Sequence, residues 1–543
     1  MTAPPWPATR RAWHARRGAR RGALLLCAAL AAGATAPRAA VRREIRGVDA
    51  LVRAYDVILD GRFDRIDAEL RRACGPGNPD ATLPARWGGG PAPGEACDVL
   101  DATALWWQIL LDPESRALDD EFSEAAERAI RTAQAWTERS PEDPESWFYL
   151  GGAYAARVQW RVLRDEKLAA ARDGKNIKLA LERAIALDPA LEDAYFGLGM
   201  YKYYADVAPA AARILRFLLL LPGGDRKEGL EQMLRARNRG RLLQGEADYQ
   251  LHIIYLWYER RTPRALELLH ALHDRYPANP LFLAQIADIE DRYLHDVTAS
   301  LATWRRLLTA ARAQRVSAPL LSEVQARLGI ARHLDALHLT DDTIDTLMAV
   351  IALRPTAPYA SLPLAYLRLG QALDRMGDRA AALEAYREAI AAAPASDPHN
   401  VRTEAGRSLR RAPDAGRAAA YRLSLEGWRH LEDNDLEEAA AALEDSLALN
   451  GSDPVARFRY GRILQARNDH AAALAQFEHA IRGAAACPAP ILGTVYLDAA
   501  RLSERLSRRE QALAYYRTAS TLFGAAADTR AAALRAITRL DHR

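Results

Sequence analysis

Histidines at helical spacing are the first residues of this sequence with the potential for chemistry. His270 and His273 stand three positions apart in a segment of helical periodicity, and two imidazoles on one face of a helix can bind a metal ion. No third ligand stands beside them, and the neighbouring positions have the composition of an ordinary helix core. The sequence therefore predicts no metal site, and nothing in it indicates a cofactor.

Motifs of hydrolases and nucleotide-binding proteins are absent from the sequence. The zinc-protease motif HExxH and the nucleophile motif GxSxG do not occur. The glycine-rich stretch from Trp87 to Gly94 follows no strand pattern and precedes no Lys-Ser or Lys-Thr, so it is not a phosphate-binding loop. Acidic runs such as 432–435 fall at predicted turns, where water solvates them. We therefore predict that the protein is not an enzyme.

Two of the four cysteines are placed to form a disulfide. Cys74 and Cys97 flank a stretch rich in glycine and proline, which has no other source of order. A bond between them would close this loop and add about 3 kcal/mol of stability by the loop-entropy estimate. The alternative is a pair of buried thiols. Cys487, which precedes Pro488 near a predicted helix start, is expected to be an inert core thiol.

The first 34 residues have the order of a secretory signal peptide. Six arginines without a single acid precede the apolar run 23–32, and the small residues 32–34 follow it. The apolar run is too short to span a bilayer. We expect cleavage after Ala34 and export to the periplasm or cell envelope. The alternative is a start codon placed too early, with a leader that has no meaning.

The charge of the chain gives no argument for nucleic-acid binding. The formal net charge is +4, but the leader contributes six arginines, so residues 35–543 have a net charge of −2. A nucleic-acid partner would require a basic domain. We therefore expect no nucleic acid among the partners, and no transmembrane helix in the mature chain.

A repeated pattern of small and large residues organises most of the chain. Small residues let two helices cross closely, large residues fill the space beside them, and a proline ends the second helix. The clearest copy is Tyr366-x-x-Leu369-Gly370-x-x-Leu373, then Gly377-Asp378, Ala382-x-x-x-Tyr386-x-x-Ala389 and Pro394. The same frame begins at Trp147-x-x-Leu150-Gly151 and recurs to the C-terminal end.

This pattern resembles the tetratricopeptide repeat superfamily over roughly residues 141–541. The resemblance implies an all-α fold, an α-solenoid of helix-turn-helix repeats that forms a right-handed superhelix. It also implies a concave groove, lined by the first helix of each repeat, that holds a peptide or a helix of a partner. The groove-facing positions that it implies are Phe148, Phe196, Tyr203, Arg332, Gln371, Arg375, Phe458, Arg462, Arg501 and Arg505.

We expect five regions along the chain. They are a signal peptide at 1–34, divergent helical hairpins with the Cys74–Cys97 loop at 35–140, a first repeat array at 141–394, a joint at 395–415, and a second array with a capping helix at 416–543. Insertions near 157–174 and 205–224 separate the two helices of successive repeats. Equivalent turns of neighbouring repeats share one edge of a solenoid, so the two insertions should meet.

The second insertion contains an apolar run. Its large side chains are Ile214, Phe217, Leu218 and Leu221. One interpretation is a local core packed under the first insertion. The other is an exposed patch for a partner or for peripheral contact with a membrane surface. The run is too short for a transmembrane helix, and an arginine interrupts it.

Three arginines occupy the same slot of their repeats. A column of Arg332, Arg462 and Arg501 facing the groove would suit carboxylates or acidic peptides. The alternative is that these arginines pair with nearby acids such as Asp335 and Glu504. They do not match the lysine and asparagine clamp of the repeat proteins that bind chaperone tails, so that activity is not expected.

The leading hypothesis is a non-enzymatic scaffold of the periplasm or cell envelope. It would bind other proteins in its groove during envelope assembly, secretion or polysaccharide export. A second hypothesis is a ligand-binding or regulatory module whose groove holds a glycan or a lipid. A third is an enzyme whose active site is built from the insertions.

Overall fold

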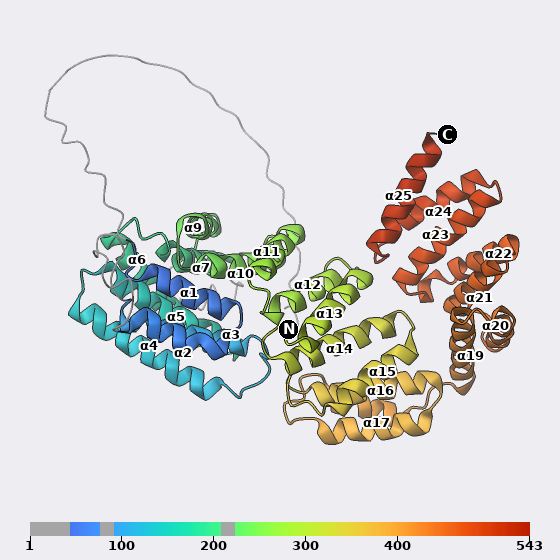
Figure 1. Ribbon diagram of the computed structural model, residues 1–543, viewed down its shortest axis with the longest axis horizontal. Helices are drawn as coiled ribbons and strands as arrows, with labels where there is room; N and C mark the ends of the chain where they lie inside the picture. Colours follow the sequence, from blue (N-terminus) through green and yellow to red (C-terminus); the bar gives the residue numbers. More distant parts are fainter. Residues whose placement is uncertain (1–43, 76–91, 208–222, 543) are drawn as a thin grey trace, which may run out of the picture. The chain divides into compact units, whose positions relative to one another are not determined.

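The computed structural model describes residues 44–75, 92–207 and 223–542 (Figure 1). These residues form 24 α-helices and contain no strand. Consecutive helices pack against each other in pairs, and each pair contacts the next. The predicted all-α solenoid of repeated helix pairs is confirmed. The proposed leader, residues 1–34, lies outside the described residues.

Nine helix pairs make up the repeats. The first helices are α5 (Pro144–Leu163), α7 (Ala194–Val207), α10 (Gln244–Ile253), α12 (Pro280–Arg292), α14 (Pro319–Ala336), α16 (Ser361–Met376), α19 (Ala415–Glu432), α21 (Pro454–Ala466) and α23 (Ala489–Arg505). The second helices are α6 (Lys167–Leu187), α9 (Arg226–Arg239), α11 (Thr262–Arg275), α13 (Val297–Arg312), α15 (Thr340–Ala352), α17 (Arg379–Ala392), α20 (Leu436–Leu449), α22 (His470–Arg482) and α24 (Arg509–Thr521). The others are α1 (Val48–Leu59), α2 (Ile66–Cys74), α3 (Gly94–Ile109), α4 (Asp119–Arg139), α18 (Val401–Arg410) and α25 (Ala527–Asp541).

Local sequence explains where several first helices begin. α5, α12 and α21 each start with proline, whose missing N–H is not needed at that position. The preceding Asp143, Asn279 and Asp453 accept hydrogen bonds from backbone N–H groups of the first turn. These caps satisfy donors that a helix leaves free at its N-terminus.

Glycines set the close crossings within the pairs, as the repeat pattern predicts. A Cβ on Gly370 of α16 would lie 2.6 Å from the ring of Tyr386 on α17. At the crossing of α7 and α9, a Cβ on Gly199 would lie 2.6 Å from the carbonyl oxygen of Gly229. Backbone meets backbone at this point, so neither helix can accept a side chain without moving apart.

The first insertion is divided between the two helices of its pair. α5 continues to Leu163 and α6 begins at Lys167, so both are longer than their counterparts. Asp173 on α6 is buried and accepts hydrogen bonds from Arg157 and Arg161 on α5, which joins the two extensions. The apolar run of the second insertion, with Ile214, Phe217, Leu218 and Leu221, lies outside the described residues.

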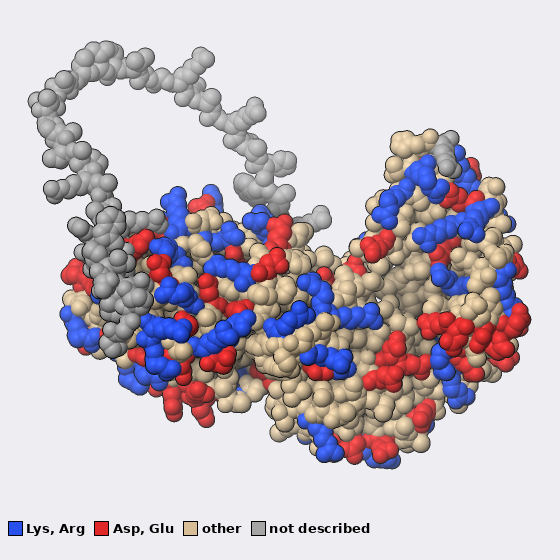
Figure 2. Space-filling model, in the orientation of Figure 1, with Lys and Arg blue, Asp and Glu red and all other residues tan. Residues whose placement is uncertain are grey.

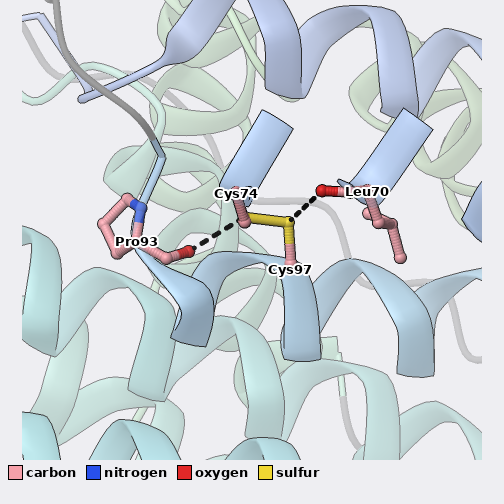
Figure 3. Close-up of a disulfide and its surroundings, with 4 residues drawn as sticks. All are labelled: Leu70, Cys74, Pro93 and Cys97. Carbon is pink, nitrogen blue, oxygen red and sulfur yellow. Dashed lines mark hydrogen bonds between the residues drawn. A yellow bond between two sulfur atoms is a disulfide. The ribbon is translucent and has the colours of Figure 1, made fainter. Parts of the chain in front are cut away.

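A disulfide joins the N-terminal helices. Cys74 at the end of α2 is bonded to Cys97 in the first turn of α3 (Figure 3). The loop that this bond closes includes residues 76–91, which lie outside the described residues. The bond removes chain entropy from the unfolded state and so stabilises the contact between the two helices. Cys487 is buried, and burial raises the pKa of its thiol to about 12.

Helices α1 and α3 pack along the first helices of the early repeats. Tyr55 of α1 and Trp107 of α3 both donate hydrogen bonds to the buried Glu246 of α10, at 3.1 and 3.2 Å. The Trp107 ring lies 4.7 Å from Tyr249 and 6.1 Å from Phe282 of α12. One hydrophobic cluster therefore extends from α1 through α3 and α5 to α12.

The segment predicted as a joint contains a helix. Val401 and Ala405 of α18 are buried in one cluster with Ala382 and Tyr386 of α17. Arg379 also donates hydrogen bonds to the last carbonyl groups of α18. The region boundaries at 140, 394 and 415 stay predictions. Among the described helices, none is long and apolar enough to cross a membrane.

Candidate partner-binding face

One side chain from each of the last five first helices occupies an equivalent position. In each helix this residue comes directly after the small residue that the second helix of the pair crosses. Successive residues of an α-helix are rotated by about 100°, so its side chain points away from the second helix. α14, α16, α19 and α21 contact one another in succession, and α21 packs with α23 in one hydrophobic cluster, which places these positions in sequence along one face. This first-helix column consists of Arg332, Gln371, Trp428, Arg462 and Arg501. Trp428 was missed by the sequence analysis, although its position after Gly427 marks the same slot.

Two arginines of the column share one carboxylate. Arg462 of α21 and Arg501 of α23 lie 2.8 and 3.2 Å from the two oxygens of Asp498. The Asp498 side chain is 2% exposed, whereas those of Arg462 and Arg501 are 41% and 54% exposed. Two guanidinium groups on one carboxylate leave an excess of one positive charge, with N–H donors that face water.

Arg505 extends this group by one helical turn. It is exposed, and its Nη1 lies 3.1 Å from Nε2 of His470 at the start of α22. We call Arg462, Arg501 and Arg505 the C-terminal arginine cluster. Guanidinium groups bind carboxylates through paired hydrogen bonds, so the cluster can accept an acidic side chain or a C-terminal carboxylate.

Arg332 belongs to a different set of ion pairs. It lies 3.0 Å from Asp291 and 3.5 Å from Asp288 of α12, which neutralise its charge. Asp335, which the sequence suggested as its partner, instead binds Arg375 of α16 at 2.7 Å. The predicted arginine column is therefore interrupted, because Gln371 and Trp428 occupy the slots between Arg332 and Arg462.

Glu504, the other acid suggested as a partner for the column, has a different role. Both of its oxygens accept hydrogen bonds at 2.6 Å from Arg539 of α25. This bidentate pair holds the capping helix against α23. Arg501 lies 3.2 Å from Asp498, three positions before it on the same helix.

Four aromatic residues predicted to face the groove are buried, which corrects their assignment. Phe148 and Phe196 belong to the N-terminal hydrophobic cluster, where α3 packs against α5. Tyr203 is fully buried and donates a hydrogen bond to Glu259 at 2.7 Å. Phe458 packs between the rings of Trp428 and Phe477. These side chains stabilise the fold, and a partner cannot contact them in this conformation.

A buried polar network joins the repeats on either side of the predicted joint. Arg459 of α21 is buried and donates hydrogen bonds to Ser424 of α19 and to the carbonyl oxygen of His338, both at 2.8 Å. The Tyr421 hydroxyl of α19 lies 2.7 Å from that of Thr340. The network ties the turn between α14 and α15 to α19 and α21, so it positions the arginine cluster relative to α14.

His338 makes this network sensitive to acid. Burial, and then the charges of Arg375 and Arg459, lower the pKa of its imidazole to about 4. Below the ordinary histidine value of about 6.5 the unfolded chain takes up a proton that the folded protein excludes, so stability falls as the pH drops from about 6.5 to about 4. We expect the His338→Asn variant to lose roughly 1–3 kcal/mol less stability than wild type over this pH range. The free energy of unfolding in urea, measured at several pH values, gives the difference.

Asparagine is the chosen replacement because residue 338 has a positive φ of 58°, which asparagine tolerates. His295→Asn is the matched control, since His295 also has a positive φ and is exposed. We expect it to leave the slope of stability against pH unchanged. An unchanged slope in His338→Asn would contradict the assignment.

The described residues offer no metal site. Within residues 44–75, 92–207 and 223–542, no group of three or more His, Cys, Asp or Glu side chains is arranged to hold a metal ion. His270 is exposed on α11, and His273 on the same helix is half-buried.

Charged side chains of both signs are interspersed on the face in view in Figure 2.

Comparisons with known proteins concern the fold. Residues 364–396 match the family profile described as tetratricopeptide repeat. Among solved structures, the TPR2AB domain of yeast Sti1 in complex with pHSP90 is 15% identical, with 55% of this chain and 97% of that chain covered and a TM-score of 0.20. The TPR domain of P58(IPK) is 13% identical, with 82% and 98% covered and a TM-score of 0.22.

A human IFIT1 dimer with PPP-AAAA is also 13% identical, with 82% of this chain and 96% of that chain covered and a TM-score of 0.28. TM-scores this low do not establish a common arrangement of the helices. Comparison with curated proteins gave no match.

Proposed function

We propose that this chain, whose residues 364–396 match the tetratricopeptide-repeat profile, is a non-enzymatic scaffold of the periplasm or cell envelope that binds an acidic segment of a partner protein on its first-helix face. Tetratricopeptide-repeat proteins in general bind other proteins. The partner, the envelope location and the binding site belong to the proposal.

The C-terminal arginine cluster is the observation that carries the proposal. Arg462 and Arg501 share the single buried Asp498, so their positive charge is only half compensated and their side chains remain accessible. A carboxylate from a partner would supply the missing charge through charge-assisted hydrogen bonds. Trp428, in the neighbouring slot, is half-buried and offers an apolar surface beside the arginines.

The rest of the first-helix face is less available. α1 and α3 cover α5, α10 and α12, and the aromatic side chains there are buried. Arg332 and Arg375 are already paired with aspartates. The proposal therefore assigns partner binding to α19, α21 and α23.

The envelope location rests on two features of the sequence and the fold. Residues 1–34 have the order of a signal peptide, and the Cys74–Cys97 disulfide is typical of oxidising compartments. The intact mass of the protein recovered from its own host tests this part. A chain that begins at Thr35 would support export, and one that retains Met1 would contradict it.

Synthetic peptide pools test the binding part. Three pools with the same apolar content and an excess of acidic, neutral or basic residues would be incubated with the purified protein, and the retained peptides counted by mass spectrometry. We expect acidic peptides to be enriched. Equal retention of the three pools would contradict the proposal. Retention of none, together with binding on a glycan or lipid array, would favour the ligand-binding alternative.

A further inference from the structure

Large apolar side chains are exposed at the turns of two successive helix pairs. Trp257 and Tyr258 lie between α10 and α11 and are 50% and 38% exposed; Tyr293 and Leu294 lie between α12 and α13 and are each 39% exposed. Equivalent turns of neighbouring repeats lie on the same edge of a solenoid. We call these four residues the turn-edge patch. Neighbouring exposed apolar residues of this size indicate an interaction surface.

The backbone at the first turn is specialised to present its aromatic residues. α10 ends in a π-helical turn, Ile254–Tyr258, where the N–H of Glu259 donates a hydrogen bond to the carbonyl oxygen of Ile254 at 2.9 Å. Ile254, Tyr255 and Leu256 are buried, and the next two residues are exposed. π-helical turns are rare and are frequently found at functional sites. Trp257 is therefore half exposed at this turn, while the partly exposed Tyr258 ring also packs edge-on against Tyr203 and Tyr204.

The exposed charge beside the patch is positive. Arg260 and Arg261 follow Glu259 in the same turn, both are exposed, and neither has an ion pair with a described carboxylate. The adjacent acid, Glu259, is bound by Tyr203 and Arg226, and the charge of Arg261 also acts on it. Both guanidinium groups are exposed to water, so they can meet an anion.

The acids at the second turn are engaged within the fold. Asp291 pairs with Arg332 at 3.0 Å, and Glu290 accepts a hydrogen bond from Thr303 at 2.7 Å. Asp296 is buried and caps α13. Arg292 is exposed at the end of α12, 3.9 Å from Asp288. The arginines and aspartates of the second turn thus compensate one another, and the free positive charge beside the patch comes from the first turn.

This combination fits the surface of a lipid bilayer. Tryptophan and tyrosine have apolar rings with a polar group and favour the interface between lipid tails and headgroups, while arginine favours anionic headgroups. The binding centres of protein interfaces are instead well-packed pockets. These side chains lie in turns between helices. We propose that the turn-edge patch inserts shallowly into bilayers that contain anionic lipids and holds the protein at a membrane surface.

Vesicle sedimentation tests the proposal with the full chain. Vesicles of phosphatidylcholine, with and without phosphatidylglycerol, would be incubated with wild type and variants, and the pelleted fraction measured. Trp257→Ser with Leu294→Ser should weaken binding to both vesicles at least about tenfold, because the inserting side chains are lost. Arg260→Asn with Arg261→Gln should weaken binding to anionic vesicles by about fivefold per arginine and leave binding to neutral vesicles unchanged.

The matched control replaces apolar residues of another surface. Met348→Ser with Leu449→Ser removes two side chains that are each 56% exposed on the second helices α15 and α20, and should leave sedimentation unchanged. The proposal is overturned if wild type pellets with neither vesicle, or if Trp257→Ser with Leu294→Ser pellets like wild type. Self-association that this pair of substitutions abolishes, without vesicle binding, would assign the patch to a second copy of the chain. Failure of the peptide-binding test has no bearing on this result, since the arginine cluster is not altered.

Discussion

Replacing Gly199 with alanine is expected to lower the free energy of unfolding by about 3 kcal/mol. The added Cβ would lie 2.6 Å from the carbonyl oxygen of Gly229 and 2.9 Å from the backbone nitrogen of Met233. Backbone atoms cannot rotate away as a flexible side chain can, so α7 and α9 would have to separate along their crossing. Urea unfolding followed by circular dichroism measures the change.

Gly94→Ala is the control for this substitution. Gly94 also lies in a helix, at the start of α3, but a Cβ there would meet no atom within 4 Å. We expect its unfolding free energy to stay within about 0.5 kcal/mol of wild type. Equal unfolding midpoints for Gly199→Ala and wild type would contradict the close crossing. A loss confined to one early transition would show that the repeats unfold separately.

Charge reversal of the arginine cluster is expected to abolish the retention of acidic peptides. Arg462→Glu with Arg501→Glu removes two donors and places negative charge beside the buried Asp498, so binding should fall by at least about a hundredfold. The acidic pool, measured by fluorescence polarisation at several salt concentrations, gives the readout. Wild-type binding should weaken as salt rises, because exposed charges are screened.

Two further variants make this result specific. Arg407→Glu with Arg410→Glu changes the net charge equally on the exposed surface of α18, and should leave binding nearly unchanged. Asp498→Asn removes the carboxylate that the two arginines share, and should strengthen binding of acidic peptides. Weaker binding in Asp498→Asn with unchanged stability, or an equal loss in the α18 variant, would contradict the proposed site.

The repeats themselves were predictable because their determinants are local. Gly370 and Tyr386 stand on consecutive helices, and one needs the space that the other fills. The aspartate and proline at the start of α5 and of α21 are also local determinants, because they act on the first turn of their own helix. Such residues act on neighbours within about one repeat, so a pattern in the chain is sufficient to reveal them. The slot of Arg462 and Arg501 followed from the same pattern, and the structure places both beside Asp498.

The accessibility of the predicted groove could not be read from the same pattern. Tyr55 meets Glu246 across 191 positions, and Trp107 meets the same residue across 139. No local periodicity encodes contacts over such distances, so the burial of Phe148 and Phe196 beneath the N-terminal hydrophobic cluster was not foreseen. The partner of Arg332 was likewise missed, because Asp291 belongs to the preceding pair.

The sequence by itself determined that this protein is a chain of paired helices, since helix periodicity, small residues at crossings and helix caps are all short-range. Only the tertiary structure decided which part of the first-helix face remains open and which arginines keep uncompensated charge. Both depend on which carboxylates and apolar side chains, far apart in the sequence, lie close together in the folded protein. The packing of the whole chain sets that arrangement.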